Sequence, residues 1–140
     1  MDSLSAQHTI RVLVRYYEMD PLGHVNNAVY LNYAEEAAIE HSRQLGFGEA
    51  CWRELGGAWV VRRHEIDYHR PAVAGDVLDV TTRVESITQV RAMRRTSIVR
   101  LHDNVLVADA VTQWVWVGLD GRPRRLPSEL IAALRQATNQ

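Results

Sequence analysis

The chain has 140 residues, of which 46% are hydrophobic and 24% are charged, and its formal net charge at pH 7 is −1. This length fits one domain over residues 1–140, and the composition is that of a globular protein rather than a disordered or fibrous one. The near-neutral charge gives no overall field that would attract nucleic acid or an anionic membrane, so neither is expected as a partner.

The first predicted element is a half-buried strand over residues 9–17. Polar and apolar residues alternate there, with Ile10, Val12, Val14 and Tyr16 on one face. The strand is followed by a turn in which Pro21 keeps Asp20 extended and Gly23 permits a positive φ. The Asn26-Asn27 pair then offers a helix N-cap. At this point the chain is expected to change from strand to helix.

The second predicted element is a helix from about residue 28 to residue 45. Gly46 is a natural stop for it. Its expected buried stripe consists of Tyr30, Tyr33, Ala34, Ala37, Ala38, His41 and Leu45. Because three of these residues are alanine, a sheet can approach the helix closely, whereas a helix bundle would more often place leucine there.

The remaining chain is predicted to form strands after a loop or short turn at 47–57. The expected strands cover 59–70, 76–90, 93–103 and 105–118, and turn signals such as Pro71 to Gly75 and Asp120-Gly121 separate them. A short helix capped by Ser128 should end near residue 137. One helix followed by consecutive hairpins predicts an α+β fold, with an antiparallel sheet curled around the helix. A second subunit usually covers an edge or face of such a sheet.

Cysteine content and hydropathy give expectations about the cellular compartment. The lone Cys51 excludes a disulfide within the chain and a cysteine-rich zinc site. Residues 1–8 are polar, and no apolar run approaches the 18 or more residues of a membrane span. A cytoplasmic location is therefore expected.

Asp20 is the main candidate for chemistry. Ordinary aspartates are ionised at neutral pH and can act as a base toward water or as a direct nucleophile. Asp20 lies just before a helix whose first free N–H groups, near Asn27 and Ala28, could bind a carbonyl oxygen as negative charge develops on it. An isolated D-P-x-G segment is more often a simple turn with capping asparagines, so the longer sequence context decides between the two interpretations.

That context is the string E-M-D-P-L-G-H-V-N-N-A-V-Y-L-N-Y-A-E-E-A at 18–37. It closely resembles the active-site segment of the 4-hydroxybenzoyl-CoA thioesterase family of hotdog-fold proteins, including its acyl-CoA thioesterase branch. The resemblance continues through D-Y-H-R-P-A-V-A-G-D-V-L at 67–78, M-R-R-T-S-I-V at 93–99 and G-R-P-R-R-L-P at 121–127. It therefore covers nearly the whole chain.

The resemblance implies a hotdog fold, with a curled sheet of about five antiparallel strands around one long helix and a short C-terminal helix. It also implies thioester hydrolysis with Asp20 as nucleophile or general base, and with the backbone N–H of Asn27 polarising the carbonyl. No metal and no cofactor are expected beyond the coenzyme A that forms part of the substrate. The expected assembly is a homodimer or homotetramer with sites between subunits.

Further site residues follow from the same resemblance. Arg94 and Arg95 fall where the family's R-R-x-S segment contacts coenzyme A phosphates, although adjacent strand residues point to opposite faces. Arg91, Arg124 and Arg125 are fallback candidates for this contact. His24 is expected to support catalysis, while Gly23 and Tyr30 are expected beside the substrate, with Tyr30 as pocket wall.

Other interpretations remain open at this stage. A hotdog enoyl hydratase or dehydratase would use Asp20 and His24 as an acid and base pair. A non-catalytic acyl-carrier binding module would use the same pocket and would need no ionised carboxylate. The sequence does not determine the acyl group, the number of subunits, the role of Asp20 as nucleophile or base, or the choice between coenzyme A and an acyl carrier protein.

A metal site made by Glu65, Asp67 and His69 is not expected, because three such residues in one strand rarely suffice without a ligand from elsewhere.

Overall fold

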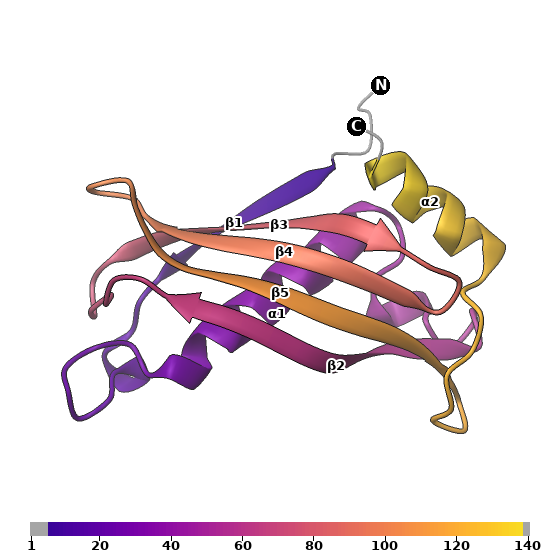
Figure 1. Ribbon diagram of the computed structural model, residues 1–140, viewed down its shortest axis with the longest axis horizontal. Helices are drawn as coiled ribbons and strands as arrows, with labels where there is room; N and C mark the ends of the chain where they lie inside the picture. The colour runs from indigo at the N-terminus through magenta and orange to yellow at the C-terminus, as the bar shows by residue number, and fades with distance from the viewer. Residues whose placement is uncertain (1–5, 139–140) are drawn as a thin grey trace.

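The computed structural model describes residues 6–138 (Figure 1). Residues 1–5 of the polar N-terminal stretch lie outside the described residues. The elements in chain order are β1 (Gln7–Leu13), α1 (Asn27–Gln44), β2 (Gly57–Tyr68), β3 (Val77–Ile87), β4 (Arg91–Arg100), β5 (Val105–Gly118) and α2 (Ser128–Thr138). Short 3₁₀ turns at Tyr16–Glu18 and Glu49–Cys51 precede α1 and β2. Within residues 6–138, no helix combines the length and hydropathy needed to cross a membrane.

The five strands form one antiparallel sheet in the order β1-β3-β4-β5-β2. The register shifts at three places, one each in the β2–β5, β3–β4 and β4–β5 pairs. Because such bulges bend and twist the strands that contain them, they favour a curled sheet. The predicted α+β architecture is confirmed, and β2 lies at one edge of the sheet although it directly follows α1 in the chain.

Helix α1 crosses one face of the sheet, behind the strands in Figure 1. The predicted stripe is confirmed, because all seven of its residues are buried and Ala37 has no exposed surface. The Asn26 side chain caps the helix at its start, and Gly46 follows its end with a φ of 87°. The small side chains on this stripe let the sheet approach the helix backbone closely.

Two clusters of buried residues divide the core along α1. The first surrounds the N-terminal half of the helix and includes Tyr30, Tyr33 and Ala37. The second surrounds the C-terminal half and contains Ala38 and Leu45, together with tryptophans of the sheet and leucines of α2. The two ends of α1 therefore lie in different surroundings.

The first strand is shorter than predicted. It ends at Leu13 instead of residue 17, and Tyr16 is 86% exposed rather than facing the core. The Glu18 carboxylate accepts a hydrogen bond from the Arg15 amide at 2.8 Å, which stabilises a 3₁₀ turn where the alternation would otherwise continue. Tyr33 of α1 donates a hydrogen bond to the same carboxylate at 2.8 Å and ties this turn to the helix.

Candidate active site

Asp20 lies in a tight turn that fixes the direction of its carboxylate. Its Oδ1 accepts hydrogen bonds from the amides of Leu22 at 2.9 Å and His24 at 3.4 Å. Its own amide donates to the His24 carbonyl at 2.7 Å, and its carbonyl accepts from the Gly23 amide at 3.0 Å. Gly23 has a φ of 79°, which other residues rarely adopt. The turn therefore holds one carboxylate oxygen while the other remains available.

The start of α1 leaves one backbone donor available beside this turn. The Asn26 side chain accepts a hydrogen bond from the Ala28 amide at 3.0 Å, so that donor is occupied. Within the described part of the chain, the Asn27 amide has no hydrogen-bond acceptor. The positive end of the helix dipole strengthens such an amide as a binding site for negative charge. Of the two amides considered from the sequence, Asn27 is the one that can serve a ligand.

A cavity of about 270 Å³ opens beside the turn and the helix start. Its lining residues are Asp20, Leu22, His24, Val25, Asn27, Tyr30, Tyr68, His69, Arg70 and Pro71. The structure thus brings together four of the residues selected from the sequence, namely Asp20, His24, Asn27 and Tyr30. Gly23 shapes the turn but does not line the cavity.

The opposite wall of the cavity comes from the end of β2 and the residues after it, none of which was selected from the sequence. Tyr68 donates a hydrogen bond to the Asn27 carbonyl at 2.9 Å and so touches the helix start directly. His69 contacts Asp109 of β5 at 2.6 Å, and Arg70 adds a cationic side chain to the lining. The only signal in the sequence was the D-Y-H-R-P segment of the family resemblance.

Tyr30 forms part of the buried wall. It is 2% exposed, and its hydroxyl accepts a hydrogen bond from the Ala72 amide at 3.3 Å. Burial raises the pKa of Tyr30, so its hydroxyl stays protonated at neutral pH. The Ala72 carbonyl accepts in turn from the Val25 amide at 2.9 Å. Residue 72 therefore joins the loop after β2 to both the Asp20 segment and α1.

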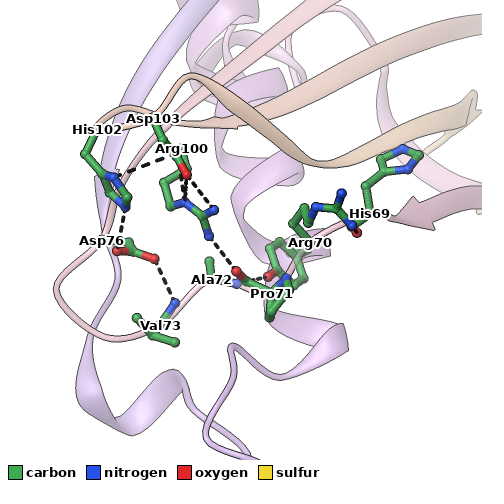
Figure 2. A network of polar contacts seen from close by, with 10 residues as sticks. His69, Arg70, Pro71, Ala72, Val73, Asp76, Arg100, His102 and Asp103 are labelled. Atoms are coloured by element: carbon green, nitrogen blue, oxygen red, sulfur yellow. Dashed lines mark hydrogen bonds and ion pairs between the residues drawn. The ribbon is translucent and has the colours of Figure 1, made fainter.

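Arg100 holds this loop from the other side, as Figure 2 shows. Its guanidinium donates to the Pro71 carbonyl at 2.7 Å and is paired with the Asp103 carboxylate, with the Nη2–Oδ2 distance at 2.8 Å. The hydrogen bond from Arg100 lowers the pKa of Asp103. Asp76 accepts from the Val73 amide at 2.9 Å and secures the far end of the loop. Arg100 thus braces the Pro71 wall of the cavity.

The structure does not support the predicted phosphate contact by Arg94. Arg94 faces the interior on the concave side of β4, is 5% exposed, and does not line the cavity at Asp20. Its Nη1 atom donates to His41 Nδ1 at 2.9 Å and to Thr82 Oγ1 at 3.2 Å. Strand alternation places its neighbour on the opposite face of the sheet, and the register of β4 assigns Arg94 to the core.

Arg95 is the outward member of this pair. It contacts Glu85 of β3 at 3.4 Å and does not line the cavity either. Its contact with coenzyme A stays a prediction. Within residues 6–138, no three His, Cys, Asp or Glu residues are grouped so that they could hold a metal ion.

Comparisons with known proteins identify the family of the chain. Residues 14–134 match the model of the thioesterase-like superfamily. The chain is 32% identical over 123 residues to an Arabidopsis thaliana acyl-acyl carrier protein thioesterase, ATL2. This match covers 88% of the chain but only 65% of the length of that relative. It is 30% identical over 126 residues to the Escherichia coli acyl-CoA thioester hydrolase YbgC, covering 89% of this chain and 93% of the relative.

A solved thioesterase from Thermus thermophilus, in complex with coenzyme A and zinc, has the same fold. It superposes with a TM-score of 0.82 at 31% identity, and the match covers 95% of each chain. The predicted family of thioester hydrolases and the predicted hotdog fold are thereby confirmed. The chain belongs to the thioesterase-like superfamily.

Proposed function

We propose that the protein is an acyl-CoA thioesterase that hydrolyses an acyl thioester to a free carboxylic acid and coenzyme A. The observation that carries this proposal is that Asp20, which has a carboxylate, and Asn27, whose amide has no acceptor among the described residues, line the same cavity of about 270 Å³. Acyl transfer needs a nucleophile or base on one side of the carbonyl and a hydrogen-bond donor for the developing oxyanion. The carboxylate and the amide supply both from one continuous segment, residues 20–27.

In the proposed reaction, the thioester carbonyl oxygen lies against the Asn27 amide at the start of α1. Asp20 either removes a proton from the attacking water or attacks the carbonyl carbon itself, forming an anhydride that water then opens. In both routes the carbon–sulfur bond breaks, its electron pair leaves with the sulfur, and the thiol takes up a proton. His24, whose side chain is at the same cavity, supports Asp20 or the carbonyl.

The carrier of the acyl group is proposed to be coenzyme A rather than an acyl carrier protein. The similarity to YbgC and to the Thermus protein in complex with coenzyme A supports this choice. The similarity to ATL2 supports an acyl carrier protein as the alternative carrier. In place of Arg94, Arg70 is proposed to contact an anionic part of the carrier, because it is exposed and lines the cavity. Arg residues bind phosphate well through their fork of N–H donors.

The proposed assembly is a homodimer that pairs through β2. This strand bonds to β5 on one side and ends the sheet on the other, so its outer edge presents backbone donors and acceptors to a partner. Val60 and Tyr68 on this strand are 42% and 43% exposed. Pairing of two β2 edges would also bring a second chain close to the Tyr68 wall of the cavity.

The test of the proposed activity is thiol release from benzoyl-, phenylacetyl-, short-chain and long-chain acyl-CoA, followed with a thiol-reactive dye. We expect turnover with at least one acyl group and a fall of about a thousandfold or more in kcat for Asp20→Asn, since this change removes the base or nucleophile. The matched control is Asp79→Asn, which removes a carboxylate that pairs with Arg11 on the surface of the sheet.

The alternatives give different results in the same experiment. Turnover in Asp20→Asn equal to that of Asp79→Asn would contradict the role of Asp20. Tight binding of acyl-CoA without thiol release by the unaltered protein would indicate a binding module. Hydration of an enoyl-CoA without thiol release would indicate a hydratase.

The proposed dimer is tested by sedimentation velocity over a range of protein concentrations. We expect a dimer for the unaltered chain and a monomer for Val60→Lys, because a lysine on an exposed edge strand opposes pairing. A Val60→Lys protein with an unchanged sedimentation coefficient would contradict pairing through β2.

A further inference from the structure

A second cavity lies at the opposite end of α1 from Asp20. It is enclosed by the C-terminal half of α1, by α2, by the segment before β2 and by the concave face of the sheet. Most of its lining is apolar, with Trp52, Trp59, Leu130 and Leu134 among the wall residues. Ser42 and Arg94 are the polar exceptions among the cavity-lining residues of the described chain. The interior of this end of the molecule therefore contains a cationic group in apolar surroundings.

Within residues 6–138, no group of opposite charge is in contact with Arg94. Both of its hydrogen bonds, to His41 and Thr82, come from Nη1, and no carboxylate in this part of the chain forms an ion pair with it. Arg94 is hydrogen-bonded to His41, and the ring of His8 is stacked on the ring of His41. The carboxylate of Glu40 lies 3.9 Å from His8. Two imidazole rings thus separate the guanidinium from that acid.

Burial of this kind is unfavourable for a charged group. It lowers the pKa of Arg94 to about 10, which is still well above neutral pH, so the guanidinium carries its charge under ordinary conditions. A buried ion without a counter-charge destabilises the folded state unless some group compensates it. A water molecule can accept hydrogen bonds from the guanidinium but cannot neutralise it.

A second side chain that lines this cavity carries a buried donor. The indole Nε1 of Trp114 is buried and, among the described residues, has no hydrogen-bond partner. Trp114 lies on β5 two residues after Thr112, which is opposite Arg94 in the sheet register. Because side chains two residues apart on a strand share a face, Trp114 and Arg94 both point to the concave side. The side chains of Arg94 and Trp114, each with a buried donor, therefore both belong to the wall of one cavity.

The size of the cavity limits what could accept from them. Its volume is about 20 Å³, which is enough for a group the size of one water molecule and too small for an acyl chain or a phosphate. We propose that Arg94 and Trp114 form a buried site for a small monovalent anion of halide size. This site is separate from the cavity at Asp20 and does not depend on the proposed thioesterase activity.

The first test measures thermal stability at constant ionic strength while sodium gluconate is replaced by sodium chloride or sodium bromide. A ligand that binds only the folded state raises Tm saturably, and at about ten times Kd the expected rise is roughly 3–6 °C. Arg94→Met should abolish the halide response. Arg95→Met is the matched control, because it removes a cation from the neighbouring, outward position and should keep the response.

A Trp114→Phe variant serves if Arg94→Met does not fold, since it keeps the guanidinium and removes one donor. Its halide midpoint should rise about tenfold or more, as expected for the loss of a hydrogen bond to a charged group. Equal halide responses in the unaltered protein and Arg94→Met, or an unchanged midpoint in Trp114→Phe, would overturn the proposal.

The second test is crystallographic. Crystals grown in sodium bromide should give an anomalous difference peak between the Arg94 guanidinium and the Trp114 indole. Density at that position without an anomalous signal would identify a water molecule and overturn the proposal.

Discussion

The two ends of α1 present positive charge in opposite ways. At its start, which we call the catalytic end after the proposed roles of Asp20 and Asn27, the residue whose amide has no acceptor among residues 6–138, Asn27, lines an open cavity of about 270 Å³. At its other end, the arginine end defined by Arg94 and Trp114, two side chains with buried donors line a much smaller and less open cavity of about 20 Å³. A wide cavity can admit a substrate, whereas a narrow one suits a small ion.

The difference follows from what packs around each half of the helix. The catalytic end is bordered by loops, which can expose backbone groups to solvent and present them to ligands. The arginine end is covered by α2 and by large side chains such as Trp59 and Trp114. If the two ends are independent, a substitution at the catalytic end should leave the halide response of Tm unchanged, and a substitution at the arginine end should leave thioester turnover unchanged.

Beyond Asp20→Asn, the largest effect is expected from removing the Asn27 amide. Proline is well tolerated at the first residue of a helix, and Asn26 already has an extended backbone with φ −58° and ψ 137°. Asn27→Pro should therefore fold and yet lower kcat by about 10²- to 10³-fold, because the oxyanion loses a donor. Steady-state thiol release measures this change.

Asn27→Ala is the matched control, because it removes the side chain and keeps the amide. We expect it to retain most of the activity. Equal rates for the two variants would show that the amide of residue 27 does not bind the carbonyl oxygen.

A substitution in the middle of α1 should affect both ends together. Ala37 has no exposed surface and packs where the sheet approaches the helix. Ala37→Leu overfills this space and should lower the free energy of unfolding by about 1–3 kcal/mol. Urea unfolding measures the loss, and a stability equal to that of the unaltered protein would show that the helix can move away from the sheet without penalty.

A smaller effect on activity is expected from replacing Arg100, which donates a hydrogen bond to the Pro71 carbonyl in the wall of the catalytic end (Figure 2). Arg100→Gln should lower kcat/KM by roughly tenfold, corresponding to about 1.4 kcal/mol, the scale of one lost hydrogen bond to a charged group. Arg11→Gln removes a comparable surface ion pair, with Asp79, from a residue that has no proposed role in the site, and it should change activity little. Equal losses in both variants would indicate a general effect of surface charge.

The smallest effect concerns His64, on β2 between the two ends. Burial lowers its pKa below the ordinary value of 6.5. The unfolded chain therefore binds a proton at this residue more readily than the folded one, and stability should fall as pH drops through 6.5 toward the lower folded pKa. His64→Gln should reduce the difference in stability between pH 7.5 and pH 5.5 in urea unfolding. An unchanged difference would assign the pH dependence to other histidines.

Several features of the fold and of the catalytic end could be predicted because they depend on neighbouring residues. The buried stripe of α1 follows from helical periodicity, and Asp20, His24 and Asn27 come from one continuous segment. The early end of β1 could not be predicted from alternation, because the bond between Arg15 and Glu18 competes with the strand.

Features that depend on distant segments were missed. Alternation shows that Arg94 and Arg95 point to opposite faces, but only the pairing of β4 with β3 and β5 decides which of them is buried. The cavity wall at Tyr68 and Arg70 likewise depends on the loop after β2 folding back onto the start of α1.

The most direct test of the independence of the two ends of α1 compares Asp20→Asn and Arg94→Met in two assays. These assays measure thiol release from acyl-CoA and the halide dependence of Tm. We expect Asp20→Asn to lose turnover and keep the full halide response, and Arg94→Met to lose the halide response and keep turnover within a few-fold. Loss of both properties in either variant would contradict the independence of the two ends, and full turnover in Asp20→Asn would contradict the proposed catalytic end.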